Sequence, residues 1–123
     1  MGTNVFFNSR DELFRVNLSY IVYFEADGNY TRFVSANGLS NMIYMNLGKI
    51  EEFLSFRSSK SAATKSFARV GKSYIINLKY IYSVNTLKQE LILSDQHSFS
   101  MKLPLPKIAL KKLKELISPI DKA

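Results

Sequence analysis

The stretch most suggestive of chemistry is residues 66–78, SFARVGKSYIINL, with Gly71-Lys72-Ser73 at its centre. The same three residue types end a nucleotide-binding P-loop, in which loop amides and the start of a following helix hold the phosphates. Here Phe-Ala-Arg-Val precedes the glycine and is too bulky to wrap a phosphate, and Tyr-Ile-Ile follows the serine and favours a strand. We therefore interpret Gly71-Lys72-Ser73 as a basic turn between two strands.

Positive charge is concentrated around this turn. Lysine and arginine total 17 against 10 acidic residues, which gives a formal net charge of +7. Residues 1–52 carry four basic and six acidic side chains, whereas residues 53–89 carry seven basic side chains and no acidic ones. Segregated positive charge of this kind can hold a polyphosphate such as nucleic acid, and the open alternative is a basic surface that contacts only solvent.

The composition narrows the class of protein. The 123 residues, 46% of them hydrophobic, suit one compact domain with one core. No apolar run reaches the roughly 18 residues that span a bilayer, and no signal-peptide pattern is present, so we expect a cytosolic location and no membrane partner. Cysteine is absent, and the single histidine, His97, has no catalytic or metal-binding partners near it in the sequence. We therefore predict no enzymatic activity, no cofactor and no metal.

Short segments rich in Val, Ile, Phe and Tyr, bounded by Asn, Gly, Asp or Ser, predict a mainly β fold of small antiparallel sheets. The predicted strands are 5–7, 14–17, 21–25, 30–35, 41–45, 67–70, 74–76, 81–86, 91–94 and 98–103. Asn37-Gly38 predicts a type I′ hairpin turn, in which both central residues have positive φ. Asp27-Gly28-Asn29 predicts a further connection between strands.

Two stretches predict helices instead. In NLGKIEEFLSF, Asn46 can cap a helix with one apolar face, formed by Leu47, Ile50, Phe53 and Leu54. In PKIALKKLKELI, Pro106 suits the first helical position and precedes an apolar stripe of Leu110, Leu113 and Leu116/Ile117. This C-terminal helix closes the core or, alternatively, meets a membrane surface or a partner. Between the two helices, residues 57–66 predict a flexible basic loop.

Nucleic-acid binding has more support in the sequence than catalysis. Lys72 and Ser73 lie on the predicted basic turn, from which such side chains can reach phosphates or guanine edges. A second predicted turn combines amide, hydroxyl and guanidinium groups in the sequence Asn29, Tyr30, Thr31 and Arg32. For Tyr30, packing in the core remains an open alternative.

With these features in place, the chain resembles a LytTR-type DNA-binding domain, the output module of many bacterial response regulators. The resemblance is carried by IVYFEADGNYTRF at 21–33, NLGKIEEFL at 46–54 and FARVGKSYIINLKYIYSV at 67–84. The last stretch is similar to the family pattern Phe-x-Arg-[Val/Ile]-His-[Arg/Lys]-Ser-[aromatic]-[aliphatic]-Val-Asn. In order and spacing the resemblance extends from about Val5 to Ile117.

The resemblance implies a LytTR-like β sandwich that binds specific double-stranded DNA sequences to regulate transcription. Loops between strands would enter successive major grooves, and the implied contact regions are residues 29–32, the turn at Lys72 and Ser73, and the segment around Lys102. Gly71 stands where the family usually has histidine, so that imidazole contact is missing here. We expect Arg69 and Asn77 to fix the geometry of the turn.

The loop at 57–66 is longer than the resemblance leads us to expect, and its Arg57, Lys60 and Lys65 predict additional phosphate contacts. We expect the domain to span residues 5–117, with tails at 1–4 and 118–123. A receiver domain on the same full-length chain is an implied partner, and we expect a monomer that pairs on DNA repeats.

Two other functions remain open from the sequence alone. One is an RNA- or single-strand-binding β domain that uses exposed tyrosines as stacking platforms. The other is a basic domain that binds an acidic protein partner.

Overall fold

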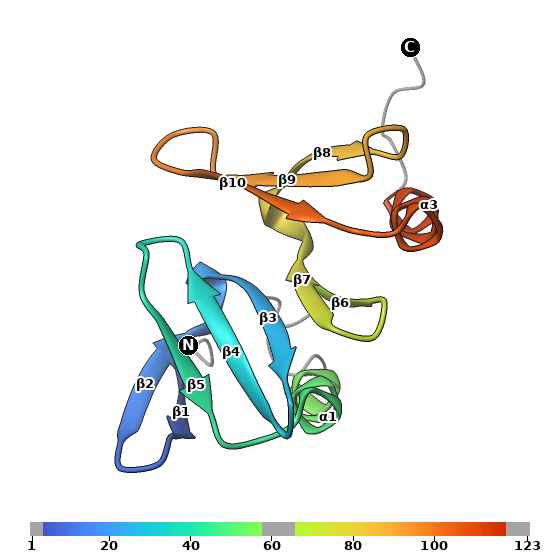
Figure 1. Ribbon diagram of the computed structural model, residues 1–123. Coiled ribbons are helices and arrows are strands. Elements are labelled where there is room, and N and C mark those ends of the chain that lie inside the picture. The colour runs from blue at the N-terminus through green and yellow to red at the C-terminus, as the bar shows by residue number, and fades with distance from the viewer. Residues whose placement is uncertain (1–3, 58–65, 118–123) are drawn as a thin grey trace. The chain divides into compact units, whose positions relative to one another are not determined.

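The computed structural model describes residues 4–57 and 66–117, and the chain divides into two compact units, residues 1–79 and 80–123. The first unit contains a two-stranded sheet, β1-β2, and a five-stranded antiparallel sheet in the order β5-β4-β3-β7-β6 (Figure 1). Its elements are β1 (Asn4–Asn8), β2 (Leu13–Asn17), η1 (Leu18–Tyr20), β3 (Ile21–Asp27), β4 (Tyr30–Ser35), β5 (Ser40–Ile43), α1 (Leu47–Arg57), β6 (Phe67–Val70) and β7 (Tyr74–Asn77).

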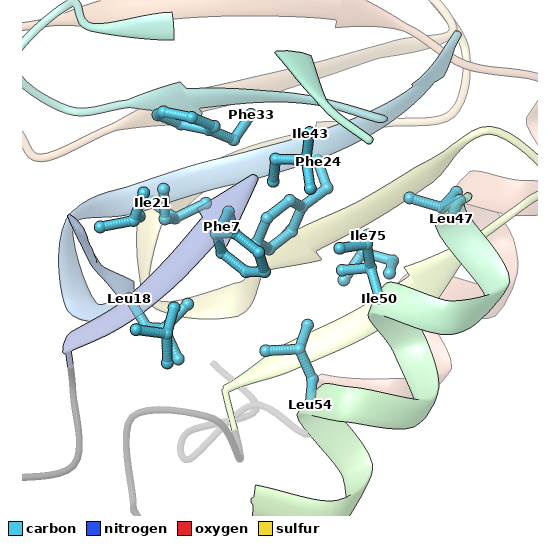
Figure 2. Packing of buried hydrophobic residues seen from close by; sticks show 12 residues of the cluster. Phe7, Leu18, Ile21, Phe24, Phe33, Ile43, Leu47, Ile50, Leu54 and Ile75 are labelled. Atoms are coloured by element: carbon cyan, nitrogen blue, oxygen red, sulfur yellow. The ribbon is translucent and has the colours of Figure 1, made fainter. Parts of the chain in front are cut away.

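The core of the first unit lies between one face of the five-stranded sheet, the β1-β2 hairpin and α1 (Figure 2). Phe7 of β1 shows how the three parts meet. Its ring lies 6.5 Å from that of Phe24 on β3 and 5.9 Å from that of Phe53 on α1, edge to face in both cases. Such aromatic pairs add to the gain from apolar burial, so the hairpin and the helix fix the sheet from the same side.

Helix α1 begins as the sequence predicts. The Asn46 side-chain oxygen accepts a hydrogen bond from the Lys49 N–H at 2.9 Å, which satisfies one of the amides that the first turn leaves without a helical partner. Leu47, Ile50 and Leu54 are buried on one face. The helix packs against β3 and β7, the central strands of the sheet.

The second unit has a three-stranded antiparallel sheet in the order β10-β9-β8, with α3 packed against β8 (Figure 1). Its elements are β8 (Ile81–Asn85), β9 (Glu90–Ser94), β10 (Ser100–Pro104) and α3 (Lys107–Leu116); η2 (Leu78–Tyr80) precedes them. Ala109, Leu110 and Leu113 form the buried side of α3. Pro106 is the N-cap rather than the first helical residue, so α3 begins one residue later than predicted. None of the described helices has the length and apolar character needed to cross a membrane.

The predicted mainly β class, with an internal and a C-terminal helix, is confirmed. The predicted type I′ turn at Asn37-Gly38 is wrong. Gly38 has φ +90°, whereas Asn37 is not among the residues with positive φ. The Gly38 N–H donates to the Ser35 carbonyl at 3.0 Å, and the Ser35 N–H donates to the Leu39 carbonyl at 2.8 Å. The loop therefore has three residues and ends on a left-handed glycine, the second common way to close a hairpin.

Candidate nucleic-acid interface

Two of the three predicted contact regions lie at the same end of the five-stranded sheet. Strand β3 is the common neighbour, because it pairs with β4 on one side and with β7 on the other. Asp27 at the end of β3 lies opposite Tyr30, and the Ala26 N–H donates to the Ser73 carbonyl at 2.8 Å. The β3-β4 turn and the β6-β7 turn are therefore adjacent, although some forty residues separate them in the sequence.

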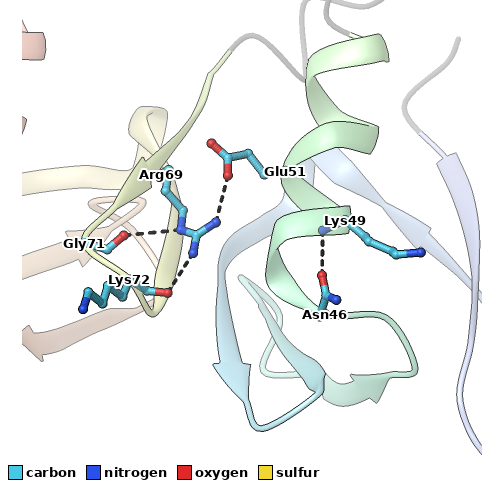
Figure 3. A network of polar contacts seen from close by, with 6 residues as sticks. All are labelled: Asn46, Lys49, Glu51, Arg69, Gly71 and Lys72. Carbon is cyan, nitrogen blue, oxygen red and sulfur yellow. Dashed lines mark hydrogen bonds and ion pairs between the residues drawn. The ribbon is translucent and has the colours of Figure 1, made fainter.

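The β6-β7 turn is held through its backbone by one side chain, Arg69. Its Nε donates to the Gly71 carbonyl at 3.3 Å and its Nη2 to the Lys72 carbonyl at 2.9 Å (Figure 3). Its Nη1 donates to Glu51 Oε1 on α1 at 2.8 Å. Gly71 has φ +65°, a left-handed conformation that glycine adopts without steric cost. The expectation that Arg69 fixes the geometry of the turn agrees with these contacts.

Lys72 and Ser73 are both exposed at this turn. In Figure 3 the Lys72 side chain points away from Arg69 and from α1. Within residues 4–57 and 66–117, no carboxylate lies within ion-pair distance of its ammonium. The turn thus combines a fixed backbone with a positive charge directed into solvent.

Asn77 has a different position from the one that we expected. Its side chain is fully buried at the far end of β7, where Nδ2 donates to the Ile21 carbonyl at 2.8 Å. Its Oδ1 accepts from the Ser66 hydroxyl at 2.7 Å and from the Lys79 N–H at 3.2 Å. Asn77 therefore ties β7 to β3 and acts on the Lys72 turn only through the strand.

The β3-β4 turn exposes Asn29 at its tip. Gly28 has φ +60° and Asn29 does not have positive φ, so the glycine occupies the first central position of a two-residue turn, as in type II′. Thr31 is fully buried, and its hydroxyl donates to the Met45 carbonyl at 2.8 Å. Because its hydroxyl is buried and bonded within the fold, Thr31 holds the hairpin in place and is not exposed for the predicted contact with DNA.

Tyr30 lies at the surface rather than in the core, with 41% of its area exposed. Its ring stacks on that of Tyr44, with centroids 4.2 Å apart and planes 15° apart. Arg32 is also exposed and lies opposite Glu25 in the pairing of β3 with β4. The guanidinium of Arg32 therefore projects from the same sheet face as an acidic neighbour.

That sheet face carries a small polar cluster. The Tyr74 hydroxyl donates to Glu25 Oε2 at 3.2 Å, and the Tyr23 and Tyr74 rings meet edge to face at 5.8 Å. Burial, reinforced by the charge of Glu25 and this hydrogen bond, raises the pKa of Tyr74 to about 12. Burial, again with the charge of Glu25, raises the pKa of Tyr23 as well. Both phenols therefore stay neutral at physiological pH.

Lys102, the third predicted region, is on β10 in the second unit. Its side chain is 68% exposed, and its ammonium lies 4.0 Å from Glu90 Oε2. Strand pairing explains the contact: Lys102 lies opposite Ile92, two residues from Glu90, so the acid is its diagonal neighbour on one face. The positive charge of Lys102 is therefore partly balanced within the fold.

Most of the predicted basic loop, residues 57–66, lies outside the described residues. Arg57 is the last residue of α1, while Lys60 and Lys65 lie outside the described residues. Two residues beside the candidate contacts, Glu51 and Tyr44, were not predicted from the sequence. Glu51 is 18 residues from Arg69 and Tyr44 is 14 residues from Tyr30, so no local pattern links either pair.

Comparison with known proteins decides the family. The model of the LytTr DNA-binding domain matches residues 11–118. The chain belongs to the LytTR family. A solved LytTr DNA-binding domain of a response regulator from Bacillus cereus is similar in fold, with a TM-score of 0.64 and 19% sequence identity over 93% of this chain and 95% of that one. No curated protein matches the chain. LytTR domains are DNA-binding domains of response regulators rather than enzymes, and the resemblance found from the motifs is confirmed.

Proposed function

We propose that this LytTR domain binds specific double-stranded DNA sequences and regulates transcription by placing inter-strand turns in the major groove. One observation carries the proposal: the Lys72 turn and the Asn29 turn lie side by side on the end of one sheet. A protein recognises sequence through base edges, which requires donors held at fixed positions, whereas phosphate contacts mainly position the protein. Two adjacent fixed turns meet that requirement.

The side chains divide into two roles under this proposal. Lys72 reads a guanine edge, with Ser73 and Asn29 beside it as hydrogen-bonding groups. Arg32 and Lys102 contact phosphates, since each has an acidic neighbour that an anionic backbone can displace. Arg57, Lys60 and Lys65 contact phosphates and do not select the sequence.

The proposed setting is that of a response regulator in the cytosol. We propose that a receiver domain on the same full-length chain controls the domain, and that the isolated domain is a monomer that pairs on repeated DNA sites. Sedimentation of the domain alone and with duplexes carrying one or two selected sites tests the pairing. A stable dimer without DNA would contradict it.

Selection of bound duplexes from a random pool, followed by affinity measurements on the selected sequence, tests the function. With about four to six phosphate contacts, the slope of log K against log salt is expected to be about −4 to −5. Single-stranded RNA at the same salt is expected to compete poorly. A pool that yields no preferred duplex, or RNA that competes as well as DNA, would contradict the proposal. Arg57, Lys60 and Lys65 changed together to Ala should weaken binding without changing the preferred sequence.

A further inference from the structure

The stacked rings of Tyr30 and Tyr44 form an aromatic pair on the surface of the first unit. The rings are nearly parallel, yet Tyr30 keeps 41% and Tyr44 keeps 43% of its area exposed. Burial in the core therefore does not account for the pair. Each ring covers part of the other, and the remaining exposed surface is open to solvent or to a ligand.

The backbone beneath both rings is fixed. The Tyr44 N–H donates to the Asn8 carbonyl of β1 at 2.8 Å, directly after the buried Ile43. On the other side, Thr31 follows Tyr30 and donates its hydroxyl to the Met45 carbonyl. A ligand that meets these rings therefore meets a surface with little conformational entropy to lose.

The pair lies at the end of the sheet that carries the proposed DNA contacts. Tyr30 follows the Asn29 turn directly, and Thr31 pairs with Ile43, so Tyr44 extends β5 toward the same end. Since β4 and β5 are neighbours in the sheet, the aromatic pair continues the line formed by the Asn29 turn and the Lys72 turn. It continues this line toward the β5 edge.

We propose that Tyr30 and Tyr44 form a binding subsite for the sugar–phosphate backbone of DNA, next to the Asn29 turn. Tyrosine hydroxyls donate to phosphate oxygens, and the ring is an apolar surface for deoxyribose. A base cannot enter between the two rings, because they already stack on each other at a centroid distance of 4.2 Å. The inference rests on the proposed function and adds Tyr44, a residue without charge, to the interface.

The experiment compares Tyr44→Phe and Tyr44→Ala with Tyr20→Ala. Tyr20 is also an exposed tyrosine, with 55% of its area exposed, and it lies directly before β3, at the end of that strand opposite to the Asn29 turn. It therefore controls for the loss of a surface ring. The probe is the duplex selected by the wild-type domain, together with copies in which single phosphates are replaced by uncharged methylphosphonates. Affinity for each probe and the melting temperature of each variant are measured.

Loss of one hydroxyl–phosphate hydrogen bond in Tyr44→Phe should weaken duplex binding by about 3- to 10-fold with unchanged melting. Tyr44→Ala should weaken it further, and Tyr20→Ala should bind as the wild type does. One methylphosphonate position should weaken the wild type yet leave Tyr44→Phe unaffected, an outcome that a merely structural ring would not produce.

Three results would overturn the inference. If Tyr44→Phe binds with wild-type affinity and Tyr44→Ala has a lower melting temperature, the two rings stabilise the fold and do not contact DNA. Loss of single-stranded RNA binding with unchanged duplex affinity would assign the rings to base stacking. Failure of the wild-type domain to bind any duplex would remove the proposed function and the inference with it, whereas the first two results leave the function intact.

Discussion

Lys72 and Lys102 are the same residue type in contrasting settings. Lys72 lies on a turn whose backbone carbonyls are held by Arg69, and its ammonium points away from that network. Lys102 lies within a strand, and its ammonium is 4.0 Å from the Glu90 carboxylate. A lysine can distinguish one base from another only where the backbone around it is fixed, because an ammonium on a flexible stem otherwise acts as a point charge.

The largest expected effect comes from Arg69→Ala, which removes the support of the Lys72 turn. The change breaks three hydrogen bonds, and the unfolding free energy should fall by about 2 kcal/mol in urea denaturation. The affinity ratio between the selected and a random duplex should collapse, because Lys72 keeps its charge and loses its position. An unchanged ratio would show that the turn does not need Arg69.

Glu51→Gln is the matched control for Arg69→Ala. It weakens only the contact to α1 and leaves both bonds from Arg69 to the turn. An exposed ion pair contributes at most about 1 kcal/mol, so stability and the affinity ratio should change little.

Gly71→Ala should have the next largest effect, about 1 kcal/mol of stability. A Cβ at this position meets nothing within 4 Å, so the cost comes from the backbone angle of φ +65° rather than from a clash. Gly71→Asn should cost less, since asparagine tolerates the left-handed region better than alanine. Equal stability of all three proteins in urea would show that the turn is not held in this conformation.

Lys102→Ala should have a smaller effect that is the same for every sequence. Removal of one phosphate contact should reduce the magnitude of the salt slope by about 1 and leave the ratio of selected to random affinity unchanged. Glu90→Gln should slightly strengthen binding at low salt, because Lys102 loses its acidic neighbour. A change in the preferred sequence with Lys102→Ala would place this lysine on a base and remove the contrast with Lys72.

The smallest effect concerns Tyr74, which adjoins the Lys72 turn. Its pKa is raised from 10.0 to about 12, so the folded protein holds this proton more tightly than the unfolded chain does. The stabilisation is therefore present below pH 10 and is lost as the pH rises from about 10 to 12. The free energy of unfolding, measured by denaturation across this pH range, should fall less steeply for Tyr74→Phe than for the wild type. An identical slope would contradict the raised pKa of Tyr74. DNA recognition at neutral pH should change little.

Features that depend on residues close together in the chain could be predicted from the sequence alone. Alternating apolar residues and turn residues locate the strands to within about two residues, and Asn46 marks the start of α1. The same alternation places Thr31 on the face of the buried Phe33, a signal of its burial that the motif-based interpretation did not use. For Asn37-Gly38, two- and three-residue loops suit the same residues, so the turn type could not be chosen.

The supports of the interface are tertiary contacts and could not be predicted. Arg69 meets Glu51 only because α1 packs beside β7, and Tyr30 meets Tyr44 only because β4 and β5 pair. Lys72 was predicted as a contact from its motif, whereas the reason for its fixed position, Arg69 bound to two turn carbonyls, needed the structure.

Lys72→Ala tests the central claim most directly, with Lys102→Ala measured beside it. Affinities for the selected and the random duplex are compared at one salt concentration, together with the melting temperature of each variant. Lys72→Ala should melt as the wild type does, lose about 1 to 3 kcal/mol on the selected duplex and lose much less on the random one. A Lys72→Ala protein that melts normally and binds the selected duplex with wild-type affinity would contradict the claim that this turn reads DNA.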